Sequence, residues 1–294
     1  MFYRRKVILS LLQLFNGELE KIRLQKLLFL FSQQQPVATY DFVPYKYGCF
    51  SYSANADLTT MVNKGLLAES ETSFKRTDPT DYTKTLREAD RKLLYQVKKL
   101  YGGMDANALM KHTYVNYPYY AINSVKAKSI LSPIELDKVE ATRPSDEDTI
   151  LFTIGYEGIS LEEYLNRLVK NNVKVLVDVR RNPLSMKYGF SKAQLIRSCR
   201  SLGIAYMHFP EVGIQSNLRQ ELNCQADYDK LFTLYRENEL PITLPTQQSI
   251  LNILKQHKRI ALTCFEKDIC QCHRKHLAEA IVRLPGFDYQ LNHI

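Results

Sequence analysis

Eleven residues near the end of the sequence concentrate side chains that could do chemistry. The segment 264–274 reads CFEKDICQCHR and holds three cysteines, two carboxylates, one histidine and two cations. The apolar run 259–264 predicts a buried strand, and a helix is predicted from about Cys272 onward. In parallel α/β sheets, ligands bind just beyond the carboxyl ends of the strands. We therefore expect this turn to form one wall of a cleft.

The three cysteines allow two chemistries. Thiolates and imidazoles are zinc ligands, and a thiolate at a helix N-terminus can act as a nucleophile. The spacing C-x5-C-x-C-H is not a standard zinc pattern, so we predict no metal site and no cofactor. Cys272, at the predicted helix start, is a candidate for a nucleophile or for a substrate contact. Packing of Cys272 in the core is the alternative.

Acidic residues follow the other predicted strands in the same way. Glu157 comes after the strand predicted at 151–154, and Asp178 lies in the strand predicted at 174–179. A carboxylate in a buried strand needs a partner, and Arg180 or Arg181 is the obvious one for Asp178. Because the carboxyl ends of parallel strands share one edge of the sheet, these groups should converge on one cleft. The catalytic candidates are Glu157, Asp178, Glu266 and His273.

Cations and hydroxyl groups accompany these carboxylates. The positive end of the predicted helix and the neighbouring guanidinium groups would favour a bound phosphate. The candidates for substrate or phosphate binding are Tyr156, Arg180, Arg181, Ser185, Lys187, Arg219, Cys272 and Arg274. Phosphate recognition next to carboxylates suits cleavage of a phosphodiester or of an N-glycosidic bond. In the second case a carboxylate positions water, and the base must first leave the duplex.

The order of the predicted elements indicates two domains, which fits a chain of 294 residues. Strands alternate with helices over 150–294, which predicts an α/β domain of three layers, with a parallel sheet covered on both faces. Residues 1–131 are mainly helical. Three helices followed by a hairpin ending at Arg76 predict a winged-helix-like domain, and a helix expected at 81–101 begins its extension. The polar, proline-containing segment 132–149 is the expected linker.

The net charge points to a partner. Residues 1–145 hold 21 Lys/Arg against 14 Asp/Glu, a balance of +7 out of the +9 of the whole chain. A basic domain favours a polyanion, here double-stranded DNA, although solubility alone explains the charge equally well. The oligomeric state stays open, and a homo-oligomer is compatible with the sequence.

Three features predict a cytoplasmic protein without a membrane partner. The sequence has no run of about 18 apolar residues. Its apolar N-terminal segment lacks a small-residue cleavage site and continues as an amphipathic helix. Half of the six cysteines crowd into 264–274, which is not a spaced disulfide framework.

The C-terminal half resembles a known family. The motifs TIGYEG, DVRRNPLS, GFSK and CFEKDICQCHR are similar, over about 150–283, to those of the domain-of-unknown-function 488 family. The positions that match its pattern are Tyr156, Glu157, Asp178, Arg180, Pro183, Ser185, Phe190, Ser191, Lys192, Gly213, Arg219, Cys264, Glu266, Cys272, His273 and Arg274. Met186 stands where arginine is usual, and Gln215 where proline is frequent. The resemblance implies a compact α/β domain with a polar, nucleic-acid-related cleft, and it supplies no reaction.

The N-terminal part resembles a second group. Through LQKLLFLF, FVPYKYGCFS and DLTTMVNKGLL, residues 1–75 are similar to the winged-helix domains of the SocA-like and YwgA-like group. This resemblance implies toxin control, nucleic-acid binding or protein–protein contact, without choosing among them.

Together these features favour a DNA-directed hydrolase of the DNA glycosylase type, acting on modified or foreign DNA with a role in phage defence. Asp178, Glu157 or Glu266 would handle water or the oxocarbenium ion, and His273 would hydrogen-bond the base. One alternative is a non-enzymatic, nucleic-acid-binding regulator of the antitoxin type. The other is a cysteine-dependent enzyme acting on a small phosphorylated substrate.

Overall fold

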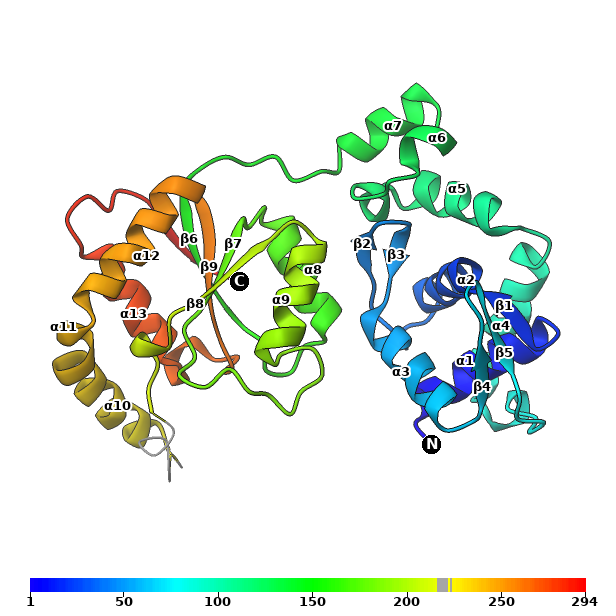
Figure 1. The fold of residues 1–294 in the computed structure, drawn as a ribbon, viewed down its shortest axis with the longest axis horizontal. Coiled ribbons are helices and arrows are strands. Elements are labelled where there is room, and N and C mark those ends of the chain that lie inside the picture. Colours follow the sequence, from blue (N-terminus) through cyan, green and yellow to red (C-terminus); the bar gives the residue numbers. More distant parts are fainter. Residues whose placement is uncertain (216–221, 223) are drawn as a thin grey trace. The chain divides into compact units, whose positions relative to one another are not determined.

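The computed structural model describes residues 1–215, 222 and 224–294. The chain divides into two compact units, Met1–Arg143 and Pro144–Ile294, and both are drawn in Figure 1. The division falls inside the segment 132–149 that was expected to be a linker. The first part of that segment is nevertheless helical, because Ser132 and Glu135 form a reciprocal capping box at the start of a short helix.

The N-terminal unit combines helices with short antiparallel strands. Its elements are α1 (Tyr3–Leu14), β1 (Glu18–Glu20), α2 (Lys21–Gln33), β2 (Val43–Tyr45), β3 (Gly48–Phe50), α3 (Tyr52–Asn63), β4 (Leu67–Glu69), β5 (Ser73–Arg76), η1 (Thr83–Thr85), α4 (Glu88–Tyr101), α5 (Ala106–Asn116), η2 (Pro118–Ala121), α6 (Ala127–Ile130) and α7 (Pro133–Glu140). Strands β1, β5 and β4 form one antiparallel sheet in that order, and β2 pairs with β3. The sequence did not predict β1 or the β2–β3 hairpin.

The helix expected at 81–101 begins later, at Glu88. The Asp81 carboxylate accepts hydrogen bonds from the Thr83 backbone and hydroxyl groups and from the Gln13 side chain. These bonds hold residues 83–85 in a short 3-10 turn. An aspartate that bonds to its neighbouring backbone competes with helix formation, which explains the late start.

The C-terminal unit is an α/β domain. Its elements are β6 (Ile150–Gly155), α8 (Leu161–Lys170), β7 (Val175–Asp178), α9 (Lys192–Ser201), β8 (Ala205–His208), η3 (Pro210–Val212), α10 (Gln225–Leu234), the π-helical turn η5 (Tyr235–Glu239), α11 (Leu240–Ile242), α12 (Leu244–His257), β9 (Arg259–Cys264), η6 (Ile269–Gln271), α13 (His273–Val282) and β10 (Gln290–His293). The five strands are parallel and follow the order β10-β6-β9-β7-β8.

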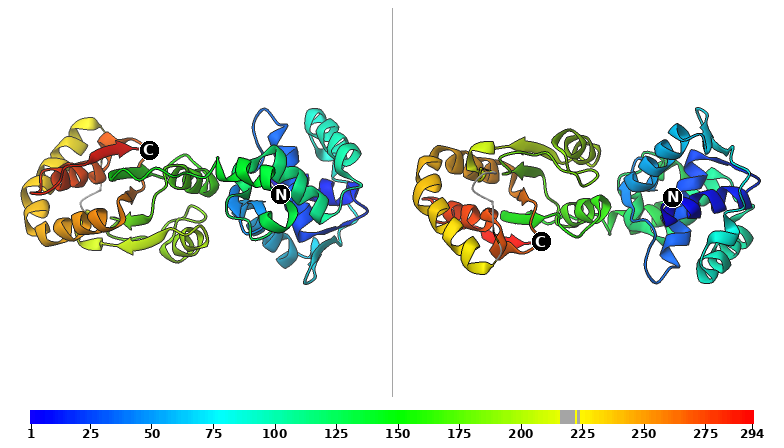
Figure 2. Two further views of the ribbon diagram at one scale, coloured as in Figure 1. Left: turned by 90° about the horizontal axis from the view of Figure 1, so that it is seen from above. Right: turned by 90° about the horizontal axis from the view of Figure 1, so that it is seen from below.

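Helices cover both faces of this sheet. Helices α8 and α9 lie on one side, and α12 and α13 lie on the other (Figure 1). The predicted three-layer α/β class is therefore confirmed. Strand β10 was not predicted; it lies at the edge of the sheet beside β6, which the views in Figure 2 also show. Its sequence, QLNH, lacks the apolar run of a central strand because an edge strand has a neighbour on one side only.

Side-chain alternation divides the reactive residues between the two faces of the sheet. Asp178 on β7 is in register with Thr263 on β9, and the Thr263 hydroxyl accepts a hydrogen bond of 2.8 Å from Tyr164 on α8. These residues therefore face α8 and α9. Cys264, the next residue, faces the opposite side and belongs to the core formed with α13. Within the described part of the chain, no helix is both long and apolar enough to cross a membrane.

Candidate functional site

A cavity of about 310 Å³ lies beyond the carboxyl ends of the central strands of the C-terminal unit. Tyr156 follows β6, Arg180 follows β7 and Cys264 ends β9, and all three line this cavity. Arg181 and Ser185 line it as well. Its volume is at the small end of the range for ligand sites, which suits one ring system rather than an extended molecule.

Asp178 and Arg180 form a fully buried ion pair beside this cavity. The Asp178 carboxylate accepts hydrogen bonds from the Arg180 Nε at 2.8 Å, from the Arg180 backbone N at 3.1 Å and from the Tyr206 hydroxyl at 2.6 Å. Burial, and next the Asp178 charge, raise the pKa of Tyr206, so its proton stays in place. With its lone pairs occupied in this way, Asp178 holds Arg180 in position and is poorly placed to activate water.

Arg180 is directed inward by its other contacts. Its Nη1 donates to the Tyr156 hydroxyl at 2.8 Å and to the Phe190 carbonyl at 2.9 Å. The Tyr156 ring stacks on Phe190, with ring centres 4.2 Å apart and an angle of 9° between the planes. Tyr156 and Arg180 thus form a rigid cavity wall, in which most of the guanidinium N–H groups already have protein acceptors.

The loop that contains residues 181–188 forms the rim of the cavity. Arg181 is exposed there, and its one hydrogen bond in the described structure is a long contact of 3.4 Å to the Pro210 carbonyl. The Lys187 ammonium donates to the Tyr156 carbonyl at 2.7 Å and so ties the loop to β6. Ser185 is tied to Ser191 through its backbone, and the Ser191 side chain makes no helix cap.

Sequence reasoning missed the apolar part of this rim. Leu184 and Met186 line the cavity and are largely exposed to solvent, and Asn182 and Ile214 line it too. Neighbouring exposed apolar side chains are one feature of ligand-binding grooves. In the sequence, this part of the rim could have been recognised from the two apolar residues within the polar turn RRNPLSMK.

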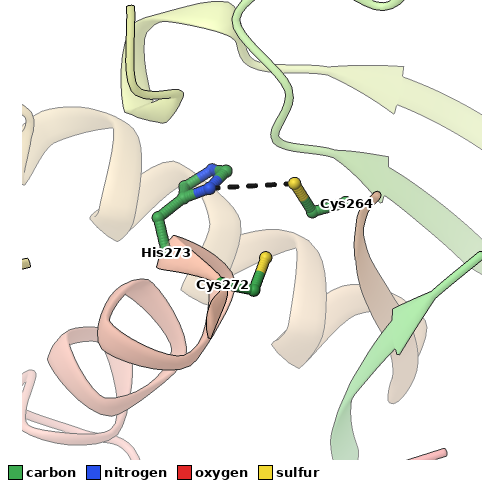
Figure 3. A group of neighbouring side chains, drawn as sticks. All are labelled: Cys264, Cys272 and His273. Atoms are coloured by element: carbon green, nitrogen blue, oxygen red, sulfur yellow. Dashed lines mark hydrogen bonds between the residues drawn. The ribbon is translucent and has the colours of Figure 1, made fainter. Parts of the chain in front are cut away.

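A buried cluster lies on the other face of the sheet. The side chains of Cys264, Cys272 and His273 point toward one another (Figure 3), and their ligand atoms lie within 4.8 Å of one another. The His273 Nε2 lies 3.0 Å from the Val179 carbonyl. Because a carbonyl can only accept, Nε2 carries the hydrogen and Nδ1 presents its lone pair to the Cys264 Sγ at 3.7 Å.

Cys272 is completely buried, and burial raises the pKa of its thiol well above the usual value. Neither Cys272 nor His273 is among the described residues that line the cavity. The thiol that reaches the cavity is that of Cys264, which was not one of the predicted site residues. Cys272 therefore lacks the exposure and the thiolate character of a nucleophile.

The remaining charged candidates shape the loop after β9. The Glu157 carboxylate accepts from the Lys267 backbone N at 2.9 Å, and the buried Arg274 donates from Nη1 to the Glu266 carbonyl at 2.6 Å. Glu266 itself is half-buried, and its Oε2 accepts from the Cys264 thiol at 3.1 Å. Arg219 lies outside the described residues.

Gly155 explains why the first motif needs a glycine before Tyr156. A Cβ atom at this position would lie 2.0 Å from the Glu266 carbonyl oxygen. The strand β6 and the loop after β9 can approach this closely only without a side chain.

A larger cavity, of about 720 Å³, lies in the N-terminal unit among α2, α3 and the two hairpins. Its walls are mainly apolar and aromatic, with Phe50 and Phe74 among them, and the buried Lys26 lines it. Size alone does not identify chemistry. We place the candidate site in the smaller cavity because Arg180 of the buried ion pair and the Cys264 thiol line it, and the half-buried Glu266 carboxylate accepts a hydrogen bond from that thiol.

Comparison with protein families gives one match. The family described as "Domain of unknown function DUF488" matches residues 160–281, from the start of α8 nearly to the end of α13. The predicted resemblance of the C-terminal half is confirmed over these residues, whereas the resemblance predicted for residues 1–75 stays a prediction. No curated protein matches the chain.

Proposed function

We propose that the C-terminal unit, which contains a domain of unknown function, excises a base from DNA by hydrolysing its N-glycosidic bond. One observation carries the proposal: the cavity at the carboxyl ends of β6, β7 and β9 combines aromatic and apolar walls with an exposed guanidinium and an adjacent half-buried carboxylate. A flipped base needs a ring-sized pocket with stacking surfaces, and its backbone needs a cation.

Glu266 is the catalytic carboxylate in this proposal. It follows Phe265, which lines the cavity, and its side chain reaches Cys264, which also lines it. Asp178 and Glu157 are engaged by Arg180, Tyr206 and the loop after β9, so they serve as positioning residues. Glu266 would take a proton from water while the water oxygen bonds to the sugar carbon, and the base would leave with the bonding electrons.

The rim supplies the binding groups. Phe265 is part of the cavity wall and has a partly exposed ring, so a base could stack on it, with Leu184 and Met186 as further apolar contacts. Arg181 would bind the phosphate beside the flipped nucleotide. His273 is buried away from the cavity and would act on the site only through Cys264.

The N-terminal unit would hold the duplex. Its order of helix, strand, helix, hairpin, helix and hairpin supports the winged-helix interpretation, in which the third helix enters the major groove. Helix α3 has no lysine or arginine but exposes Asn55, Thr59 and Asn63, whose side chains can bond to base edges. Phosphate contacts would then come from cations elsewhere in this basic unit.

The test uses the full chain and duplexes that carry different modified bases, with unmodified duplex as the reference. Abasic sites are read as strand breaks after alkali. We expect breaks with at least one modified duplex, and a loss of at least about 100-fold in rate for Glu266→Gln, as is usual when a general base is removed. Glu163→Gln, on the outer surface of α8, is the matched control and should keep full activity.

Two outcomes would overturn the proposal. The first is the absence of abasic sites on every duplex together with no DNA binding at low salt. The second is DNA binding with wild-type biological activity in Glu266→Gln, which is the result that a non-enzymatic regulator of the antitoxin type would give.

A further inference from the structure

We propose that Cys264, Cys272 and His273 bind one Zn²⁺ ion at the end of strand β9. The proposal does not depend on base excision, because metal content is measured without any substrate. It replaces the expectation, drawn from the irregular cysteine spacing, that the chain has no metal site.

The distances fit a tetrahedral zinc site. Zinc lies about 2.3 Å from thiolate sulfur and about 2.0–2.1 Å from imidazole nitrogen, so two ligands of one ion are about 3.5–3.8 Å apart. The Cys264 Sγ and the His273 Nδ1 are 3.7 Å apart, and the Cys272 Sγ lies within 4.8 Å of both. Small rotations of side chains would bring the three atoms to ligand distance.

The histidine is already oriented as a ligand. Its Nε2 donates to the Val179 carbonyl, which leaves the lone pair of Nδ1 directed at the Cys264 Sγ. Zinc-bound histidines nearly always donate their second ring N–H to a carbonyl or carboxylate in this way, because that bond fixes the tautomer and the ring orientation. Figure 3 shows the imidazole and the two thiols facing one common point.

The charge balance also suits a buried ion. All three side chains are buried, and two thiolates neutralise Zn²⁺, so the loaded site has no net charge to desolvate. The Arg274 Nε is buried and has no hydrogen-bond acceptor among the described residues. A thiolate on Cys272, two residues earlier in the chain, would place a negative charge near the Arg274 guanidinium.

Three protein ligands leave a fourth position for water. This is the arrangement of catalytic zinc sites, whereas structural sites use four protein ligands. Cys264 belongs to the cavity wall, and Glu266 reaches its sulfur, so the ion would lie between the buried cluster and the cavity. Soft thiolate ligands together with one imidazole select zinc over magnesium or calcium.

The test measures metal in the full chain purified under reducing conditions. We expect about one Zn²⁺ per chain by inductively coupled plasma mass spectrometry. Cys264→Ser, Cys272→Ser and His273→Asn should each lose most of it. Two control variants should retain it: Cys199→Ser, a buried thiol on α9, and Cys270→Ser, an exposed thiol in the same turn.

A second measurement needs no variant and so does not depend on their folding. After zinc is removed, the wild-type chain is titrated with Co²⁺, and sulfur-to-cobalt charge-transfer bands should reach their full height at about one equivalent. Absence of these bands, retention of zinc in both Cys264→Ser and Cys272→Ser, or adventitious metal that washes off would each overturn the proposal. A Cys264–Cys272 disulfide found by mass spectrometry of the freshly purified chain would also contradict it.

Discussion

The imidazole of His273 presents its Nδ1 to the Sγ of Cys264 at 3.7 Å, across the gap between helix α13 and the end of strand β9. The backbone carbonyl of Val179 fixes the orientation of this imidazole, because it accepts a hydrogen bond from Nε2, the other ring nitrogen. The contact joins the start of the helix to the sheet on the face opposite the Asp178–Arg180 pair. Arg180 and Cys264 therefore reach one cavity from the two faces of the same sheet.

Removal of the Asp178 carboxylate should be costly. In Asp178→Ala the buried guanidinium of Arg180 loses its counter-ion and two hydrogen bonds, and breaking a buried ion pair from one side costs about 3–5 kcal/mol in the free energy of unfolding. The measurement is denaturant unfolding of the full chain, followed by a signal from the C-terminal unit. A loss below about 1 kcal/mol would show that water or a rearranged partner replaces the carboxylate.

The matched control for this change is Glu163→Ala. Glu163 pairs with Arg167 one turn later on α8, at 2.7 Å, and both side chains are more than one third exposed. Exposed pairs of this kind contribute only about 0.3–0.5 kcal/mol. The two variants therefore separate the effect of burial from the effect of pairing.

Gly155→Ala should displace the loop after β9. Its new Cβ would lie 2.0 Å from the Glu266 carbonyl oxygen, so the backbone must move, at a cost of about 1–3 kcal/mol. Because that loop carries Glu266, base excision should fall as well. Gly103→Ala, whose Cβ would meet nothing within 4 Å, is the control and should leave both quantities unchanged. Equal stability and activity of the two variants would contradict this view of the loop.

Much of the architecture could be predicted from the sequence because it depends on periodicity. The runs VLVD and RIALTC are rich in apolar and β-branched residues. This local pattern predicts central strands without any knowledge of the residues that pack against them. Strand β10 was not predicted, because an edge strand needs no apolar run. Helix α4 began later than expected because the side chain of Asp81 holds the preceding turn.

The roles of the site residues were harder to predict. Sequence order places Asp178 and Glu266 at neighbouring strand ends, but it does not say that Tyr206 and Arg180 occupy the lone pairs of Asp178. It also does not say which of two closely spaced thiols reaches a cavity. Cys264 was considered as a zinc ligand but was not chosen as a site residue, because it is the last residue of a predicted buried strand and the sequence does not show which face of the sheet its side chain occupies.

Arg181 should contribute to DNA binding through its charge. Arg181→Ala should weaken binding to duplexes of any sequence and reduce the slope of log K against log salt concentration by about 1, as for the loss of one phosphate contact. Arg200→Ala removes the same charge from an exposed position on α9 and serves as the control. A salt slope that falls equally in both variants would mean that only the overall charge matters.

Lys26 makes the stability of the N-terminal unit depend on pH. Burial lowers the pKa of its ammonium below the usual 10.5, and its one hydrogen bond in the described structure goes to the Cys49 carbonyl. Between the lowered pKa and 10.5 the unfolded chain binds more protons than the folded chain, so stability rises with pH across this window and is lost as pH falls.

The variant Lys26→Met tests this dependence, because it keeps the length of the side chain and removes the charge. Thermal unfolding at about pH 7 and about pH 9.5 should show a smaller gain with pH in the variant than in the wild-type chain. An unchanged difference between the two pH values would mean that Lys26 is charged in the folded state at both.

The most direct measurement of base excision is the identity of the product. The full chain is incubated with a duplex that carries the modified base for which alkali-sensitive sites are found, and the soluble fraction is analysed by mass spectrometry. We expect the free base, in an amount equal to the abasic sites, from the wild-type chain and from Glu163→Gln, and none from Glu266→Gln. Release of nucleotides instead of the free base, or equal release from Glu266→Gln, would contradict the proposed reaction.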